Sequence, residues 1–311
     1  MISYAQNFED VILRRVFRDR SEGFYIDVGA MHPVFESVTK FFYDQGWSGI
    51  NIEPNEWFYG KLLEERPRDI NLNLALGEQD ETRELYLFER IGNSTFEKSS
   101  RDRYVEKGYE AIPRQVRVTT LAAICRDYVR RPIDFLKVDC EGWEEYVLKG
   151  ADWDRFRPAV LIVEATEPGT SIPSWNEWEP YLIETARYEM AYFDGLNRFY
   201  IPREYPDLRC HFKLPPNFFD EFKSHALASA EQSNEALREE RDSLVRRTSE
   251  LEEQLGRNSA ENVKLAERVA ELEKTLREVD KRAAQLDQEL HWTRLWVGRL
   301  SQDLAASKRR G

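Results

Sequence analysis

The chain has 311 residues, of which 41% are hydrophobic, and a formal net charge of −12. It is long enough to bury a core, and its acidity excludes a protein that grips a nucleic-acid backbone, because that task needs a basic face. Three widely separated cysteines indicate buried thiols in a reducing cytoplasm. No stretch reaches the roughly 18 apolar residues of a membrane span. Residues 1–17 lack the apolar core of a signal peptide.

Helices and strands are predicted to alternate along residues 3–222. The period of the apolar residues separates the two kinds of element, and Gly or Pro marks most of their ends. The predicted helices cover residues 3–17, 34–43, 56–65, 121–128 and 140–150. The predicted strands cover residues 24–28, 50–52, 71–76, 84–88, 116–118, 135–139 and 159–163, with an antiparallel pair at 188–193 and 198–201. Because several strands are apolar throughout, we expect a mostly parallel sheet with helices on both faces, a Rossmann-like α/β fold.

The stretch from Gly23 to Pro54 predicts a cofactor site. It reads as strand, tight turn, helix and strand, with the turn at Asp27–Ala30 and an acid, Glu53, after the second strand. The acid can accept both ribose hydroxyls of a nucleoside, and the missing Cβ of Gly29 lets the backbone approach a ligand. The turn is not a full GxGxxG, which disfavours NAD and favours S-adenosylmethionine (SAM), a ligand without a pyrophosphate. An ordinary buried unit without a ligand is the alternative for this stretch taken alone.

Acidic residues follow the carboxyl ends of the predicted parallel strands. They are Asp27, Glu53, Asp139, Glu141 and Glu164. Ligands bind at this edge of open α/β sheets, so we expect these side chains to surround one site. Asp139, Glu141 and Glu164 are also enough carboxylates for a Mg²⁺ ion, and the sequence leaves metal dependence open.

A heptad pattern of apolar residues begins at Leu237. Fifteen of the twenty a and d positions up to residue 304 are apolar, which indicates a coiled coil over residues 237–311. As one helix it would extend roughly 100 Å. We predict a linker at residues 223–236 between it and a domain over residues 1–222.

Polar residues in the seam bear on the number of strands. Asn262 at an a position favours a parallel dimer, and Asn258 at a d position leaves a trimer open. Trp292 and Trp296 lie off the seam, near the basic residues 308–310. We interpret this stripe as local packing, with docking to a partner or a membrane surface as the alternative.

Several blocks of residues 3–217 are distinctive in combination. They are SYAQNFEDVIL at the start, FYIDVGAMHP and TKFFYDQGWSGINIEPN in the cofactor stretch, NLALG at 73–77, GNST at 92–95, IDFLKVDCEGWE at 133–144, DGLNRFY at 194–200 and PPN at 215–217. Together they resemble the FkbM family of SAM-dependent methyltransferases, and the resemblance covers residues 3–222. It implies O-methylation, often of a sugar hydroxyl in a polyketide, glycan or glycolipid.

The resemblance and the chemistry of methyl transfer assign expected roles along the cofactor. Asp27 and Gly29 shape its methionine end, Glu53 binds the ribose, and Ala30 and Pro54 are further cofactor-binding residues. Asn73, Leu74 and Ala75 are expected to lie near the adenine.

A sugar hydroxyl is a weak nucleophile, so a base or a metal would help it. The candidate bases are Asp139, Glu141 and His32. For Asp139 the alternative is a contact with the amino group of SAM or a helix cap. For His32 it is packing of a loop beside Pro33.

The leading hypothesis is a SAM-dependent O-methyltransferase that acts on a cell-surface polysaccharide or its lipid-linked precursor. Its coiled coil would hold it as an oligomer in the cytoplasm, at or near the inner face of the membrane. Expected partners are a glycan acceptor, further copies of the chain and glycosyltransferases of polysaccharide biosynthesis. A second hypothesis is a coiled-coil scaffold with a weak or vestigial enzyme. A nucleotide-sugar dehydrogenase is disfavoured by the glycine-poor turn.

Overall fold

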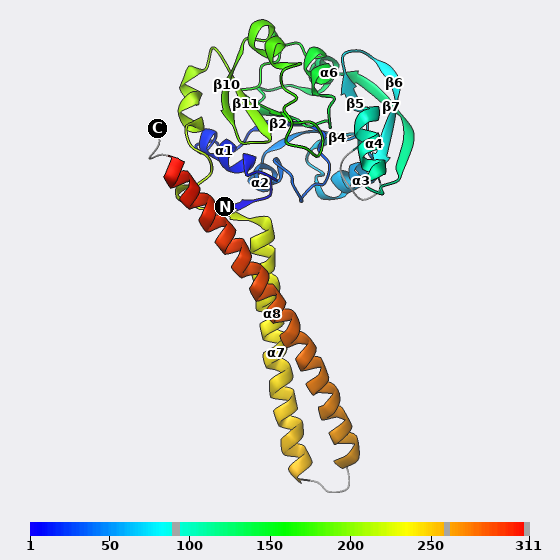
Figure 1. Ribbon diagram of the computed structural model, residues 1–311, viewed down its shortest axis with the longest axis vertical. Coiled ribbons are helices and arrows are strands. Elements are labelled where there is room, and N and C mark those ends of the chain that lie inside the picture. The colour runs from blue at the N-terminus through cyan, green and yellow to red at the C-terminus, as the bar shows by residue number, and fades with distance from the viewer. Residues whose placement is uncertain (89–93, 258–261, 308–311) are drawn as a thin grey trace. The chain divides into compact units, whose positions relative to one another are not determined.

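The computed structural model of the chain describes residues 1–88, 94–257 and 262–307. The chain divides into two compact units (Figure 1). The larger unit is Ser3–Pro216, and the smaller one combines Asn217–Gly311 with Met1–Ile2.

A seven-stranded sheet forms the centre of the larger unit. Its order is β10-β11-β9-β8-β2-β3-β4. The strands are β2 (Phe24–Val28), β3 (Ser48–Ile52), β4 (Ile70–Leu72), β8 (Phe135–Val138), β9 (Val160–Glu164), β10 (Tyr188–Phe193) and β11 (Asn197–Pro202). Strands β4, β3, β2, β8 and β9 pair in parallel, and β11 runs antiparallel to both of its neighbours. The predicted α/β fold with a mostly parallel sheet is confirmed.

Both faces of this sheet are buried, because successive side chains of its strands enter different cores. Ile26 of β2 belongs to a core that includes residues of α5 (Leu121–Tyr128) and α6 (Glu144–Lys149). Tyr25, the preceding residue, packs with residues of α1 (Glu9–Val16) and α2 (Lys40–Asp44). Alternation of this kind follows from the period of two residues in a strand. Figure 1 shows the helices around the sheet.

A second, three-stranded sheet flanks the first and corrects one prediction. The strand predicted over residues 71–76 is two strands, β4 and β5 (Ala75–Gly77), in different sheets. Asn73 lies between them, and its amide donates to the carbonyls of Glu53 (2.9 Å) and Pro54 (3.1 Å). The smaller sheet has the order β5-β7-β6, with β6 at Glu81–Phe88 and β7 at Ala111–Thr120. Helix α3 covers Glu56–Glu65, as predicted, and α4 covers Lys98–Glu106.

Three predicted helices begin later than expected. They start at Glu9, Lys40 and Glu144 instead of residues 3, 34 and 140. The turn before α6 shows one reason, because the carboxylate of Glu144 accepts the N–H groups of Cys140 (2.8 Å) and Gly142 (3.2 Å). These donors bond to a side chain instead of continuing a helix towards the N-terminus.

Shorter elements complete the described chain. They are β1 (Ile2–Ser3), β12 (Lys223–Ser224), a π-helix at Tyr181–Thr185, and 3-10 helices at Pro206–Phe212 and Phe218–Asp220. Strands β1 and β12 pair with each other.

The smaller unit contains two long helices, α7 (His225–Arg257) and α8 (Asn262–Ser307), which differ from the single rod predicted. They pack side by side in opposite directions (Figure 1). Glu231 of α7 pairs with Arg294 of α8 at 3.1 Å. Asn234, further along α7, bonds to Asp287 at 3.0 Å, further back along α8. By length the helices extend about 50 Å and about 70 Å.

The predicted heptad seam lies between α7 and α8. Each described a and d position from Leu237 to Thr293 is buried or half-buried, including Leu251, Val279 and Leu290. Asn258 and residues 308–310 lie outside the described residues. Helix α7 also takes in most of the predicted linker at 223–236. None of the described helices is long and apolar enough to cross a membrane.

Candidate cofactor and active site

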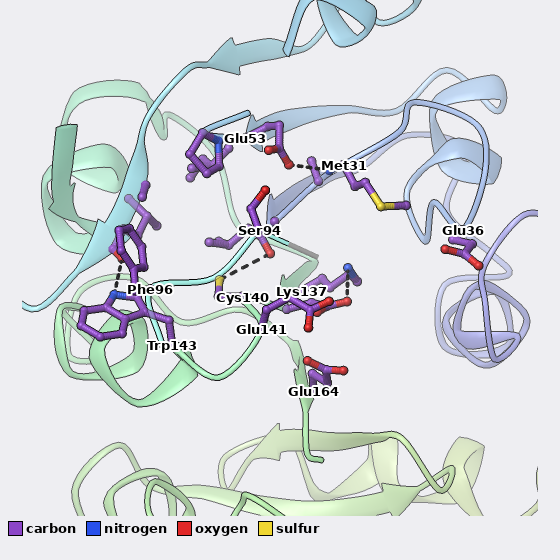
Figure 2. Close-up of a pocket in the computed structure, with 18 of the residues that line it drawn as sticks. Met31, Glu36, Glu53, Ser94, Phe96, Lys137, Cys140, Glu141, Trp143 and Glu164 are labelled. Atoms are coloured by element: carbon purple, nitrogen blue, oxygen red, sulfur yellow. Dashed lines mark hydrogen bonds and ion pairs between the residues drawn. The ribbon is translucent and has the colours of Figure 1, made fainter. Parts of the chain in front are cut away.

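A cavity of about 540 Å³ opens at the carboxyl ends of β2, β3 and β8. This is the point where the strand order reverses, because β3 pairs with one side of β2 and β8 with the other. Ligands of open α/β sheets bind at such a point. The residues that line the cavity include Val28, Gly29, Ala30, Met31, Glu53, Pro54, Ala75, Leu76, Leu85, Phe96, Lys137, Asp139, Cys140, Glu141, Trp143 and Glu164. Figure 2 shows Glu53 on one side and Glu141 with Glu164 across from it.

The turn after β2 packs against the end of β8. Gly29 has a φ of 78°, and a Cβ placed on it would lie 1.8 Å from the carbonyl oxygen of Asp139. No side chain fits there, so this position requires glycine. The sequence predicted a close approach of the Gly29 backbone to a ligand, but the nearest neighbour of that missing Cβ is the protein's own backbone. Gly29 and Ala30 still line the cavity.

Glu53 is the acid that the sequence placed at the ribose. It is 5% exposed, and its two carboxylate oxygens accept the N–H groups of Met31 (2.9 Å) and Asn55 (2.7 Å). Burial raises the pKa of Glu53 to about 7, although the two backbone donors oppose that rise. Each carboxylate oxygen keeps further acceptor capacity, so the group can receive two hydroxyls of a ligand.

An apolar wall continues from Glu53. Pro54, Ala75, Leu76 and Leu85 line it, and Phe96 closes it beside Trp143, with ring centroids 4.9 Å apart. Flat apolar surfaces of this kind suit an adenine ring. Of the residues predicted at adenine, Ala75 lines the cavity, whereas Leu74 belongs to the core and Asn73 holds the Glu53–Pro54 backbone.

Lys137 is a site residue that sequence reasoning missed. It is 7% exposed on β8, in register with Asp27 of β2. Its Nζ lies 3.0 Å from Asp139 and 3.9 Å from Asp27. Burial alone would lower the pKa of Lys137, but the charges of Asp139 and Asp27 outweigh burial and raise it. A lysine inside an otherwise apolar strand was the available signal.

Asp27, which was predicted at the methionine end, lies behind the cavity wall and does not line it. It is 1% exposed and accepts a hydrogen bond from the hydroxyl of Thr39 at 3.1 Å. Burial raises its pKa, and Lys137 opposes this. The structure therefore places Asp27 where it fixes Lys137 instead of lining the cavity.

Three carboxylates gather on the side opposite Glu53. Glu164 ends β9, Asp139 follows β8, and Glu141 adopts a positive φ of 54° in the next turn. Burial raises the pKa of Glu164 well above its usual range, and the neighbouring charges of Asp139 and Glu141 raise it further. The sequence considered Glu164 only as a metal ligand; its place at a strand end beside Asp139 makes it a candidate base.

The same carboxylates were the candidates for a Mg²⁺ site. Within the described residues, no group of three or more His, Cys, Asp or Glu side chains has the arrangement of a metal site. Asp139 is instead paired with Lys137 at 3.0 Å. The donor set therefore does not fit a Mg²⁺ ion, and we derive no step through one.

His32 lies in the loop after the cofactor turn. Its Nδ1 accepts the N–H groups of Val34 (3.1 Å) and Phe35 (3.2 Å), and its ring packs near Trp57. Burial lowers its pKa. It is not among the residues that line the cavity. This geometry matches the alternative of loop packing that the sequence left open for His32.

A glycine turn, a buried acid after β3 and a cavity at the switch point are features of a nucleoside-cofactor enzyme. A family model for the methyltransferase FkbM domain matches residues 27–190, which contain the turn, the acid and most of the residues that line the cavity. The chain belongs to the FkbM methyltransferase family, as the sequence motifs predicted. No curated protein matches the chain closely enough to count as a relative.

Proposed function

We propose that this protein is a SAM-dependent O-methyltransferase that methylates a sugar hydroxyl of a cell-surface polysaccharide or of its lipid-linked precursor. The observation that carries the proposal is that the buried carboxylate of Glu53 lines one cavity with Asp139 and Glu164, and Glu164 lies across from Glu53 (Figure 2). One side of the cavity suits a nucleoside, and the other offers carboxylates to a hydroxyl. When bound, SAM supplies a methyl group on a sulfonium for in-line transfer.

The residues on the cofactor side bind SAM and hold it in a fixed orientation. The Glu53 carboxylate accepts the ribose hydroxyls, and the wall from Pro54 to Leu85 contacts adenine. The N–H of Met31 fixes Glu53 at 2.9 Å, so the acid is oriented before any ligand arrives. Such pre-organisation lowers the entropic cost of binding.

The residues on the opposite side handle the proton of the acceptor hydroxyl. A general base must lie within reach of the proton that it accepts. Glu164 lines the cavity, whereas His32 does not, and the Nδ1 of His32 accepts two backbone hydrogen bonds. We assign proton acceptance to Glu164 together with Asp139, and Glu141 completes the wall.

The acceptor side of the cavity favours an uncharged polyol. Gln6, Glu36, Thr166, Thr170 and Ser171 also line the cavity. Hydroxyl and amide groups bond to sugar hydroxyls, whereas the acids repel a uronic acid or a phosphate at the reacting atom. The cation of this wall, Lys137, is already paired with Asp139.

Calorimetric titration with SAM tests the cofactor assignment directly. We expect binding by the wild type and at least tenfold weaker binding by Glu53→Ala, since the two ribose contacts are lost. Absence of SAM binding by the folded wild type would overturn the proposal. Binding of NAD in its place would favour a dehydrogenase.

Transfer of labelled methyl from SAM to a panel of methyl glycosides tests the acceptor class. We expect label in neutral glycosides and little in the matching uronic acids, because of the acidic wall. The second candidate, a scaffold, is favoured by the long α7 and α8 helices. It predicts SAM binding without transfer to any member of the panel or to glycan extracts.

A further inference from the structure

Two buried oxygen atoms at the cavity have no hydrogen-bond partner in the part of the chain that the structure describes. They are Oε2 of Glu164 and Oγ1 of Thr166, and both residues line the cavity. Glu164 is 8% exposed and Thr166 is 3% exposed. Buried polar atoms are nearly always hydrogen-bonded, so an unpaired one at a cavity indicates a ligand or a bound water. Glu164 already has a proposed role as proton acceptor, whereas the hydroxyl of Thr166 has none.

Glu164 and Thr166 belong to one extended segment. Beyond the end of β9, the N–H of Ala165 donates to the carbonyl of Leu196 at 2.8 Å, and Thr166 forms an antiparallel bridge with Pro173. Side chains two residues apart in an extended chain point to the same side, about 7 Å apart. Two neighbouring hydroxyls of one sugar ring, each with a hydrogen bond of about 2.8 Å, can span that separation.

A second threonine of the cavity wall, Thr170, differs from Thr166. The hydroxyl of Thr170 donates to the carbonyl of Glu167 at 2.9 Å and accepts the N–H of Ile172 at 3.1 Å. It therefore holds its own turn. The hydroxyl of Thr166 has no partner among the described residues, so its donor and its acceptor capacity are both available to a ligand.

The chemistry of this pair of side chains fits a diol. An ionised carboxylate such as that of Glu164 only accepts hydrogen bonds, whereas a threonine hydroxyl both donates and accepts. One hydroxyl of a ligand can therefore donate to Glu164 while its neighbour bonds to Thr166. An alcohol without the neighbouring hydroxyl would leave the Thr166 hydroxyl buried and unpaired, and sites built to bond a hydroxyl reject such analogues.

We propose that Thr166 is a specificity-determining residue that binds the hydroxyl beside the one that is methylated. This role rests on the proposed function, because it requires Glu164 to lie at the reacting hydroxyl. It narrows the acceptor to a sugar ring with two adjacent free hydroxyls. The second hydroxyl is bound and does not react, so no further covalent step is involved.

Titration of the full chain with methyl glycosides, followed by nuclear magnetic resonance, tests this role without methyl transfer. S-adenosylhomocysteine, which has no methyl group to transfer, is present at saturation. The probes are methyl glucoside, methyl galactoside and methyl mannoside, each with its monodeoxy analogues. We expect the wild type to bind at least one parent glycoside. Two of its analogues, which lack hydroxyls at adjacent ring positions, should bind at least about tenfold more weakly.

The variant Thr166→Val keeps the branched shape of the side chain and removes its hydroxyl. It should bind the parent glycoside about tenfold more weakly, lose the preference against one of the two analogues and keep the other preference. Thr166→Ser retains the hydroxyl and should restore the wild-type pattern. The matched control is Thr185→Val, because Thr185 is exposed and does not line the cavity. It should bind every probe as the wild type does.

Melting temperatures identify any variant that fails to fold, and the wild-type pattern of two adjacent positions needs no variant. The role of Thr166 would be overturned by a folded wild type that binds none of the probes or discriminates against no analogue. It would also be overturned by a Thr166→Val variant that keeps both preferences, even if that variant were less stable. Transfer of labelled methyl from SAM to glycan extracts reports the proposed function separately. Transfer by a wild type whose two preferences survive in Thr166→Val would overturn this role alone.

Discussion

At the residue scale, Glu53 combines burial with a carboxylate charge that the proposed contact with ribose hydroxyls requires. Two backbone N–H groups stabilise the carboxylate, yet burial dominates and raises its pKa to about 7. A hydroxyl that donates to this carboxylate favours the ionised form. Binding of SAM should therefore release a proton wherever the free protein holds Glu53 protonated.

This linkage predicts a pH-dependent affinity for SAM. Between about pH 6 and about pH 8 the affinity should rise about tenfold, because the ionised fraction of a group with a pKa of about 7 rises by that factor. Calorimetry in buffers of different ionisation enthalpy measures both the affinity and the protons released. Glu53→Gln keeps the shape of the side chain but should bind with an affinity that is flat over this range. The same slope in the variant would assign the titration to another group.

The proposed role of Glu164 and Asp139 as proton acceptors rests on their position as well as their charge. Glu164 is 8% exposed at the end of β9, and one of its oxygens, Oε2, has no hydrogen-bond partner within the described structure. A buried carboxyl group with an unfilled acceptor at a cavity wall is suited to receive a proton from a substrate.

Glu164→Gln should slow methyl transfer by about 10²–10⁴-fold, the usual contribution of a general base. SAM affinity should change by less than twofold, because Glu53 and the adenine wall are untouched. Rates measured across pH with saturating labelled SAM, which removes the pH dependence of SAM binding, should rise with pH in the wild type and lose that rise in the variant. The exposed Glu177→Gln serves as control and should match the wild type. A variant with a full rate would remove Glu164 from the mechanism.

At the scale of elements, the site depends on how closely the ends of β2 and β8 approach. Gly29 and Asp139 are 110 residues apart in the chain, and the N–H of Asp139 donates to Val28 at 3.0 Å. This contact fixes the turn that forms the cavity floor. A side chain at residue 29 would separate the two strands at the floor of the proposed cofactor and acceptor site.

Gly29→Ala should therefore lower the free energy of unfolding by about 3 kcal/mol or more, since the added Cβ meets backbone instead of a movable side chain. Gly60→Ala is the matched control, because Gly60 lies within α3 with nothing near an added Cβ. That change should stabilise the protein by up to about 1 kcal/mol. Urea unfolding measures both. Equal effects would mean that the Gly29 turn relaxes without cost.

At the scale of the whole molecule, the pairing of α7 with α8 within one chain removes the argument for self-association that the heptad pattern provided. The heptad pattern predicted a coiled coil between chains, because a lone helix would expose its seam, with a dimer favoured and a trimer left open. The structure buries that seam within one chain, through contacts such as Asn234 to Asp287. An oligomer built on the seam would require the two helices to separate and pair with another copy.

Light scattering on the full chain should accordingly give the mass of one copy, 36.8 kDa, at micromolar concentration. A mass of two copies would show that α7 and α8 pair between chains, as in a domain swap. A cysteine pair at Asn234 and Asp287 separates the two arrangements, because it closes within one chain only if the helices of that chain are partners. Reducing and non-reducing gels then report which arrangement is present.

Patterns within a few residues were sufficient to locate several helices and strands and to identify one side of the candidate site. The period of apolar residues located β2, α3 and α5, and the acid after β3 identified Glu53, because each signal depends on local geometry. The heptads likewise marked which faces of residues 237–293 are covered. Local patterns could not divide residues 71–76 between two sheets, since that break depends on the contact of Asn73 with the backbone of Glu53 and Pro54.

Only the tertiary structure decided which distant residues meet. The register of β2 with β8 pairs Asp27 with Lys137 and brings Gly29 against Asp139. The neighbouring strand β9 adds Glu164 to the same edge. The covering of the heptad seam by the chain's own second helix was equally beyond the sequence, because a seam specifies an apolar partner without specifying the chain that provides it. Sequence periodicity determines which side chains are buried, and long-range packing determines which neighbours they contact.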